Sequence, residues 1–344
     1  MQQHQIRALR RKILRWYQKN GRDLPWRHTS DPYLILVSEI MLQQTQVTTV
    51  IPFYRRWLER FPTIEELAAA PEDEVLHAWQ GLGYYTRARN LHAAAKLVTQ
   101  TYGGVISRDP ESLRSLPGMG RYTANAVATF AFDQSVPIVE ANIARLLARL
   151  FNVRIPIDST PGRERLWKFA ATIVPKRNAG RFNSALMDLG ATICTRSPQC
   201  HICPVKIFCR ATRPDSLPVK RARPKTIRLA ESYQFVRRDR HLLLERCKNR
   251  WRGMWMLPKQ PNDANAPEPI YSSVFPFTNH RITLRVFRGS VNARRSACPT
   301  TAAKSTIERR WMQISDLHLI AIPSPHRRAI NACLSLDVER PARP

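Results

Sequence analysis

The chain has 344 residues and a mass of 39.7 kDa, a length that favours two domains over one. Lys and Arg number 55 against 26 Asp and Glu, so the net charge is +29. This balance excludes a typical acidic metabolic enzyme and indicates a polyanionic partner, most simply nucleic acid; a basic protein associated with ribosomes is the alternative. The sequence has neither a run of about 18 apolar residues nor the apolar core of a signal peptide. We therefore expect a cytoplasmic protein that does not contact membranes.

The chain from residue 1 to about 211 is predicted to be helical. Asp31 and Pro32 are typical of a helix start, and the helix is expected to run on through residues 33–58. Acidic first turns predict helices within residues 63–80. Helical patterns follow at 90–102, 121–132, 142–151 and 163–174. No repeat of fixed period is visible.

The character of the sequence changes at Thr212. Residues 212–225 combine prolines with Lys and Arg and are predicted to be a basic linker. Strands are expected at 231–238, 241–247, 281–291 and 309–315, followed by a helix at 325–336. The predicted fold class is a mostly α domain over 1–211 and a smaller α+β domain over 226–337, with a tail at 338–344.

Four cysteines fall within sixteen residues, at positions 194, 200, 203 and 209. This grouping favours a metal site in a reducing compartment over a disulfide scaffold. Four thiolates suit either zinc or an iron–sulfur cluster. Only Cys200 and Cys203 form a Cys-x-x-Cys pair, whereas zinc ribbons usually have two, so the spacing favours a [4Fe–4S] cluster with Cys194, Cys200, Cys203 and Cys209 as ligands. Cys247, Cys298 and Cys333 are isolated and are interpreted as ordinary thiols.

A second motif, residues 116–124, has the sequence LPGMGRYTA between two predicted helices. Pro117, Gly118 and Gly120 permit a tight hairpin whose backbone amides can bind a DNA phosphate at the start of a helix. A plain structural turn is the alternative interpretation.

Two glutamates stand in positions that suggest chemistry. Glu39 lies in the apolar run LILVSEIML, where burial would raise its pKa as a general acid requires. Gln43 and Gln46 follow at i+4 and i+7 and are expected to form a polar stripe along the same helix face. Glu140 precedes Asn142 at the start of another helix, where capping that helix is the alternative role.

These motifs, together with GLGYYTRARNLH and FNSALMDLGATIC, resemble in order the adenine DNA glycosylases of the MutY type. That family belongs to the helix-hairpin-helix glycosylase superfamily, as does endonuclease III. The resemblance covers residues 6–211 closely and 226–337 more loosely. It implies a monofunctional, monomeric, bacterial-type repair enzyme with a [4Fe–4S] cluster and a Nudix-like second domain. The implied substrate is double-stranded DNA in which adenine is mispaired with 8-oxoguanine or guanine and is flipped out for excision.

The resemblance also implies roles for single residues. Glu39 matches the catalytic acid, Glu140 and Asn142 match the groups that stabilise the cationic sugar, and Tyr122 replaces the lysine of lyase-competent relatives. Arg27 matches a residue of the adenine pocket. Gln44 and Tyr84 match residues that wedge into the base stack beside the lesion.

Three departures from the family pattern stand out. Asp is usual where Glu140 stands, and the extra methylene moves the carboxylate by about 1.5 Å. The first cysteine gap is one residue shorter than usual. In the second domain, Thr278-Asn279-His280 stands where relatives carry a Phe-Ser-His turn that contacts 8-oxoguanine, so His280 and Asn279 are the candidate readers. The glutamate box of Nudix pyrophosphatases is absent, and we expect no nucleotide hydrolysis.

Two other functions remain open. The first is another glycosylase of the same superfamily, which acts on thymine or uracil mispairs or as an endonuclease III-like lyase and would share most of these motifs. A lyase would be expected to carry lysine at position 122. A noncatalytic protein that binds DNA lesions is the other alternative, against which Glu39 and Asn142 both argue.

Overall fold

The computed structural model describes residues 1–222, 224–263, 267–289 and 307–338. Its contacts divide the chain into two compact units, one formed by residues 1–69 with 90–222 and the other by 70–89 with 223–344. The segment 70–89 was expected to belong to the helical domain, and its grouping with the C-terminal residues is a finding of the structure. Cys298 and the tail from residue 339 onward lie outside the described residues.

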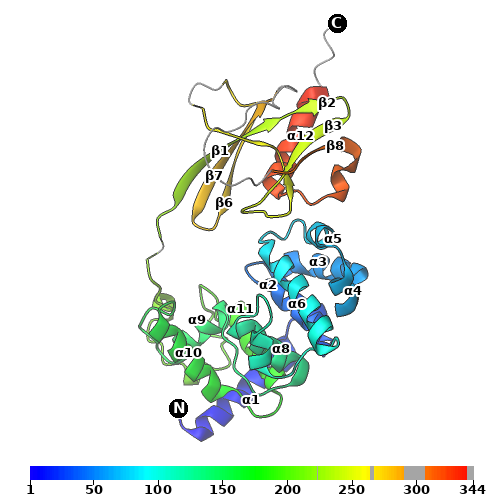
Figure 1. The fold of residues 1–344 in the computed structure, drawn as a ribbon. Coiled ribbons are helices and arrows are strands. Elements are labelled where there is room, and N and C mark those ends of the chain that lie inside the picture. The colour runs from blue at the N-terminus through cyan, green and yellow to red at the C-terminus, as the bar shows by residue number, and fades with distance from the viewer. Residues whose placement is uncertain (223, 264–266, 290–306, 339–344) are drawn as a thin grey trace. The chain divides into compact units, whose positions relative to one another are not determined.

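The first unit is helical (Figure 1). Its α-helices are α1 Gln3–Asn20, α2 Pro32–Leu42, α3 Val47–Arg60, α4 Ile64–Ala69, α7 Pro110–Arg114, α8 Arg121–Phe132, α9 Ala141–Leu150, α10 Thr160–Ile173 and α11 Ala179–Thr192, together with most of α6, Thr86–Tyr102. Short 3-10 turns lie at Pro25–Arg27, Lys206–Phe208 and Pro214–Ser216. The predicted helical character of this part of the chain is confirmed.

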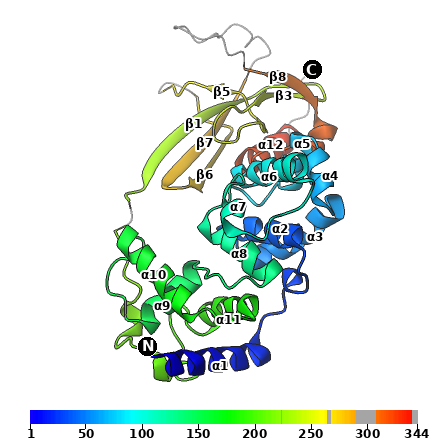
Figure 2. The same cartoon turned by 60° about the horizontal axis from the view of Figure 1, so that its bottom comes forward.

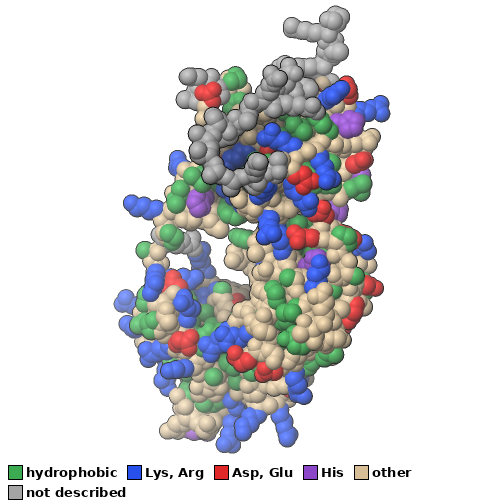
Figure 3. Space-filling model, viewed as in Figure 1, with side chains coloured by type: hydrophobic (Ala, Val, Ile, Leu, Met, Phe, Trp, Pro, Cys, Tyr) green, Lys and Arg blue, Asp and Glu red, His purple; other side chains and the backbone are tan. Residues whose placement is uncertain are grey.

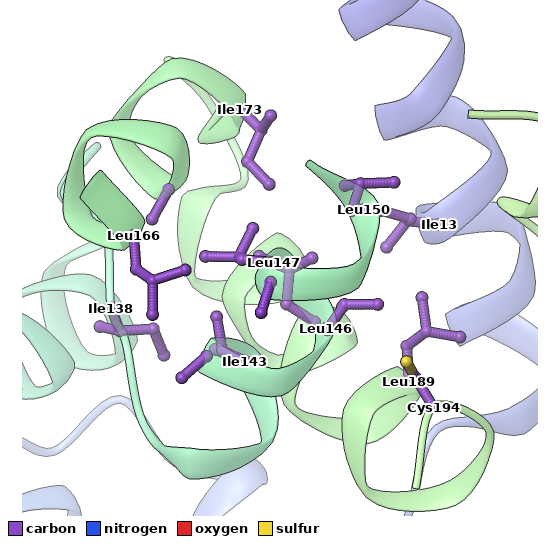
Figure 4. Close-up of a cluster of buried hydrophobic side chains, with 14 of the residues drawn as sticks. Ile13, Ile138, Ile143, Leu146, Leu147, Leu150, Leu166, Ile173, Leu189 and Cys194 are labelled. Atoms are coloured by element: carbon purple, nitrogen blue, oxygen red, sulfur yellow. The ribbon is translucent and has the colours of Figure 1, made fainter. Parts of the chain in front are cut away.

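Helix α9 forms the centre of one core of the first unit. Ile143, Leu146, Leu147 and Leu150 recur at helical spacing and are buried. They pack with apolar side chains of α1, α10 and α11, and the Cys194 thiol lies at the edge of this cluster (Figure 4). Figure 2 shows α1 running alongside α11, and these two helices are in contact. This core holds the start of α9 and the cysteine loop in one rigid body.

The helix expected across residues 33–58 is interrupted. Helix α2 ends at Leu42 and α3 begins at Val47, and Gln44 between them adopts a left-handed backbone conformation with φ 58°. The predicted polar stripe through Gln43 and Gln46 is therefore wrong, because neither residue continues the helix that carries Glu39. Glutamines carry no turn signal comparable with Gly or Pro, so the sequence pattern could not reveal this break.

The predicted linker is partly ordered against the first unit. The Val219 carbonyl accepts a hydrogen bond from the Ile157 amide at 2.9 Å. The Arg149 guanidinium donates from Nε to the carbonyl oxygens of Pro214 at 2.8 Å and Leu217 at 3.1 Å. These contacts explain why residues up to 222 group with the helices.

The second unit contains two sheets. One has the strand order β5 (Lys259–Gln260), β1 (Ile227–Phe235), β7 (His280–Arg288), β6 (Tyr271–Phe277), with β1 and β7 parallel and the other pairs antiparallel. The other is antiparallel, and β3 (His241–Arg246) pairs with β2 (Arg237–Arg238), β4 (Trp255–Met256) and β8 (Arg309–Gln313). Helix α12, Ser324–Val338, packs against β6. The unit also includes α5, Glu72–Ala78.

The α+β character of the C-terminal domain is thus confirmed. Strand β6 was not expected, because Pro276 and the two serines of YSSVFPF are uncommon in strands. The burial of its residues nevertheless alternates along most of the strand. In the part of the chain that the structure describes, no helix is long and apolar enough to cross a membrane.

Candidate active site

A cavity of about 1100 Å³ opens in the first unit. Helix α2, the loop after it, and the first turns of α8, α9 and α11 all contribute to its lining. Six residues singled out from the sequence share this cavity, namely Arg27, Glu39, Gln44, Tyr122, Glu140 and Asn142. Residues that are more than 100 positions apart in the chain therefore meet at one site, as the resemblance implied.

Glu39 is almost completely buried, with 3% of its surface exposed. The pKa of its carboxyl is raised to about 7, mainly by burial and also by the nearby charge of Glu140, against the lowering effects of a hydrogen bond from the Tyr122 hydroxyl and the charge of Arg27. Oε2 has no hydrogen-bond partner among the described residues. A buried carboxyl that titrates near neutrality and keeps one oxygen unpaired towards a cavity is suited to general acid catalysis.

Glu140 caps helix α9 and also lines the cavity. Its Oε2 accepts from the Asn142 amide and its Oε1 from the Ile143 amide, both at 2.7 Å. Burial raises the pKa of this carboxyl above its ordinary value, although the two amides favour the charged form. The capping interpretation of Glu140 is therefore confirmed, and the same two bonds fix its carboxyl group at the cavity wall.

Asn142 and Tyr122 complete the group around the two carboxylates. The Asn142 Oδ1 accepts from Arg145 Nη2 at 2.7 Å, which fixes the orientation of the amide. Burial and the two glutamates raise the pKa of the Tyr122 phenol well above its ordinary value, so the phenol stays protonated and donates to Glu39. The site thus places a protonated phenol, an amide and two buried carboxyl groups around one cavity.

Asp188 of α11 is a functional residue that the sequence analysis missed. It is fully buried, and Arg27 binds it through two parallel bonds of 2.7 and 2.8 Å. Arg22 also donates two hydrogen bonds to Asp188, from its side-chain Nε to Oδ1 at 2.7 Å and from its backbone amide to Oδ2 at 2.9 Å. Burial alone would raise the pKa of Asp188, but the bonds from Arg27 and Arg22 outweigh it and the pKa is lowered. Asp188 therefore holds Arg27 at the cavity; the one sequence signal was an acid in the apolar run ALMDLG.

The hairpin before α8 has the form that the motif predicted. Gly118 has φ 76°, and a Cβ there would meet Asn90 at 2.6 Å, so only glycine fits. A Cβ on Gly120, the residue before α8, would meet no atom within 4 Å. The exposed backbone just before α8 therefore leaves space for an external group.

Gln44 and Tyr84 are both exposed, and both have positive φ angles, 58° and 48°. Left-handed backbone is uncommon for residues other than glycine and tends to be retained at functional sites. Gln44 borders the cavity of the first unit, whereas Tyr84 belongs to the second unit.

The turn between β6 and β7 carries the other predicted contacts. Thr278 has φ 52° at its tip, and its hydroxyl oxygen lies 3.3 Å from His280 Nδ1. The Asn279 carbonyl accepts from the Ile227 amide at 2.9 Å, which ties the turn to β1. His280 and Asn279 are partly buried.

The four clustered cysteines line a separate cavity of about 270 Å³. Arg149, which is buried, donates to the Cys194 sulfur at 3.3 Å and to the carbonyl of Thr195 at 2.6 Å. Burial raises the pKa of the Cys203 thiol to about 11. Among the described residues no three or more His, Cys, Asp or Glu side chains are grouped to hold a metal ion. Arg149, which no sequence pattern singled out, fixes the loop after Cys194 through these bonds.

Lys and Arg side chains are distributed over the visible face around α1, α9 and α10, with fewer Asp and Glu among them (Figure 3). A surface of this kind attracts polyanions at long range.

Taken with the hairpin and the two-carboxylate cavity, this helical unit is of the helix-hairpin-helix DNA glycosylase class. Residues 37–171 match the family model described as "HhH-GPD superfamily base excision DNA repair protein". The chain is similar to the adenine DNA glycosylase of Mycolicibacterium smegmatis, with 46% identity over 201 residues, which are 58% of this chain and 68% of that protein. The chain belongs to the adenine DNA glycosylase family of the MutY type.

Similarity to the rat adenine DNA glycosylase is 44% identity over 216 residues, 60% of this chain and 42% of the rat protein. The match thus spans well under half the length of that relative. Among solved structures, a thermostable thymine-DNA glycosylase aligns with a TM-score of 0.56 and 32% identity, covering 60% of this chain and 96% of that one. The resemblance stated from the motifs is confirmed at the level of the family.

Proposed function

We propose that this protein is a monofunctional DNA glycosylase that removes adenine opposite 8-oxoguanine or guanine, acting as a monomer on double-stranded DNA. The observation that carries this proposal is Glu39, a buried carboxyl with a pKa of about 7 in a cavity that also contains Glu140. Membership in the adenine DNA glycosylase family supports the choice of base.

The chemistry follows from the two sides of the cavity. A flipped adenine enters, and protonated Glu39 donates its proton to N7, which makes the base a better leaving group. The bond from the sugar carbon to the base breaks, and positive charge develops on the sugar. Glu140, fixed by two backbone amides, and Asn142 stabilise that charge. Glu39, now ionised, accepts a proton from the water that attacks the sugar carbon.

Tyr122 is the basis for proposing a monofunctional enzyme. A lyase forms a Schiff base between an amine and the sugar carbon, and a phenol cannot form one. Its hydrogen bond to Glu39 gives Tyr122 a different role, that of orienting the acid.

Cys194, Cys200, Cys203 and Cys209 would hold a [4Fe–4S] cluster. Their four side chains line one cavity of about 270 Å³, and the single Cys-x-x-Cys pair favours an iron–sulfur cluster over a zinc ribbon. The raised pKa of Cys203 means that metal coordination must stabilise the thiolate. The cluster would fix the loop beside the end of α9 and take no part in the glycosidic step.

Substitution Cys200→Ser is expected to remove the brown chromophore and to lower the soluble yield several-fold, because a cluster with three thiolates left loses binding energy that also stabilises the fold. Visible absorption and iron content per chain are the measurements. Cys247→Ser, which removes an isolated buried thiol, is the control and should keep the colour. A colourless wild-type protein with one zinc ion would reverse the cluster assignment.

The C-terminal domain is proposed to be a Nudix-like module that reads the lesion through the turn at 278–280. Its mixed sheet and α12 support this comparison. His280 is the stronger candidate, since its ring can donate or accept a hydrogen bond; Asn279 offers an amide donor and a carbonyl acceptor.

For His280→Ala we expect the preference for 8-oxoguanine·A over G·A duplexes to fall by up to about tenfold, the worth of one hydrogen bond. The ratio of the two dissociation constants is the measurement. His241→Ala changes an exposed histidine of the other sheet and should leave the ratio unchanged. Equal ratios for wild type and His280→Ala would mean that this turn does not read the lesion.

The function as a whole is tested by base release from duplexes containing A opposite 8-oxoguanine, G or C, alongside T·G and U·G duplexes. We expect adenine release opposite 8-oxoguanine and G, with strand breaks only after alkali. Release of thymine or uracil in its place would favour another glycosylase of the superfamily, and strand cleavage at the rate of base release would overturn monofunctionality. Binding without release of any base would favour a noncatalytic lesion binder.

A further inference from the structure

The turn that carries Tyr84 is built as a rigid platform. Gly81, Gly83 and Tyr84 all have positive φ angles, and 46% of the Tyr84 surface is exposed. The Trp79 ring nitrogen donates to the Gly83 carbonyl at 3.0 Å, which closes the turn. The Arg87 guanidinium lies 5.5 Å from the centre of the Tyr84 ring. The exposed aromatic ring therefore sits on a backbone whose shape is fixed locally.

The base of this platform is bound to the C-terminal domain within the same unit. Gln80 Oε1 accepts from Arg327 Nη2 at 3.2 Å and from the Ile322 amide at 3.4 Å. Gln80 is the last residue before the turn. One side-chain oxygen thus joins the start of the turn to Arg327 of α12 and to the Ile322 amide, two residues before that helix.

Arg327 is itself held in place. Its Nη1 donates to the Leu317 carbonyl at 2.7 Å and its Nη2 to the Ile320 carbonyl at 2.9 Å. A guanidinium with three partners in fixed directions is a rigid connector. A second link lies at the start of α5, where Arg246 binds Asp73 at 2.6 Å.

We infer that Arg327 and Gln80 are positioning residues for Tyr84. By fixing the start of the turn, they hold the Tyr84 ring in the orientation in which it stacks against a base beside the mispair. The C-terminal domain then contributes to mispair recognition in two ways, through its own turn at 278–280 and through the segment 70–89. This inference rests on the proposed function, since it gives Tyr84 a stacking role on DNA.

The test uses the full chain and a duplex with 2′-fluoro-2′-deoxyadenosine, which resists excision, opposite 8-oxoguanine. The measured quantity is the selectivity, the dissociation constant for an A·T duplex divided by that for the mispaired duplex. Stacking by Tyr84 is available only where the stack is opened, so Tyr84→Ala should lower the selectivity by about 5- to 150-fold. Arg327→Met should lower it by about tenfold, the worth of a bond to a charged group.

A double substitution separates positioning from general support. If Arg327 acts through Tyr84, Tyr84→Ala with Arg327→Met should lose no more selectivity than Tyr84→Ala alone. Gln80→Ala should lower the selectivity as much as Arg327→Met does. Gln80→Glu keeps an acceptor for the guanidinium and should therefore have the selectivity of the wild type. Arg328→Met is the matched control, because Arg328 is the exposed neighbour on the same helix.

Two results would overturn the inference, namely losses that add in the double variant and equal selectivity of Arg327→Met and Arg328→Met. If Arg327→Met does not fold, the comparison of Gln80→Ala with Gln80→Glu decides in the same way. Base release by the wild type from an ordinary 8-oxoguanine·A duplex is measured in parallel. If the wild type releases no base, the proposed function is refuted. If the wild type releases the base but the variants keep the wild-type selectivity, only the positioning role is refuted.

Discussion

Replacement of Glu39 by glutamine is expected to lower adenine release by at least about 10²–10⁴-fold, the usual worth of a general acid. Glutamine keeps the volume of the side chain and can still accept from Tyr122, but it has no acidic proton to donate. Because the same carboxyl also takes a proton from water later in the reaction, the loss should lie towards the upper end. Duplex binding should persist, since only 3% of the Glu39 surface is exposed and the residue adds little to the surface that meets the duplex.

Single-turnover rates on an 8-oxoguanine·A duplex measure this effect. Glu59→Gln, at an exposed position of α3, is the control. The wild-type rate should fall as pH rises through about 7, because the acidic form of Glu39 is lost there. A Glu39→Gln rate within a few-fold of wild type would remove Glu39 from the mechanism.

The same substitution should also change stability, in the opposite direction. The folded-state pKa of Glu39 is raised, so the folded protein binds this proton more tightly than the unfolded chain and loses stability as pH rises between about 4.5 and 7. Glutamine at this position does not ionise, so the Glu39→Gln variant does not lose this stability as the pH rises. At pH 8 we expect Glu39→Gln to unfold with a free energy about 2–3 kcal/mol higher than wild type, with the difference vanishing near pH 4.5.

Replacement of Asp188 by asparagine is expected to destabilise the first unit by about 3–5 kcal/mol, because it leaves buried guanidinium charge without its partner. Arg27 has only 14% of its side chain exposed and would lose both of its bonds to a carboxylate. Urea unfolding at pH 7 is the measurement. Adenine release should fall as well, since Arg27 borders the cavity.

The control for Asp188 is Glu164→Gln, which breaks an exposed ion pair with Arg121 and should cost less than about 1 kcal/mol. The pH dependence gives a further check. The pKa of Asp188 is lowered in the fold, so its contribution is present above about pH 4 and is lost as the pH falls through the folded-state pKa. Equal unfolding free energies for Asp188→Asn and Glu164→Gln would show that the Arg27 pair contributes little.

Local patterns predicted the parts of this molecule that depend on local physics. Short stretches of sequence were enough to predict the helix starts at Asp31-Pro32 and at Glu140, the glycine hairpin and the burial of Glu39. The break at Gln44 could not be predicted in this way, because glutamine has no preference of its own for the left-handed backbone that it adopts here.

What the sequence could not supply were partners that are distant along the chain. Asp188 is recognisable as functional only beside Arg22 and Arg27, which are 166 and 161 positions away. Likewise, nothing in residues 70–89 indicates that they group with strands more than 130 residues later. Such pairings depend on the three-dimensional path of the chain, which composition and periodicity do not encode locally.

The grouping of residues 70–89 with the C-terminal residues has a consequence for how the protein is made. The segment leaves the ribosome long before its partners, since Arg246 lies 157 positions after Arg89 and translation adds about 5–20 residues per second. For roughly 8–30 s Asp73 therefore has no Arg246 to pair with, and Gln80 is made longer still before Arg327, so the segment cannot form these contacts during most of synthesis. The second unit, and with it the Tyr84 turn, is completed only when the chain is nearly finished.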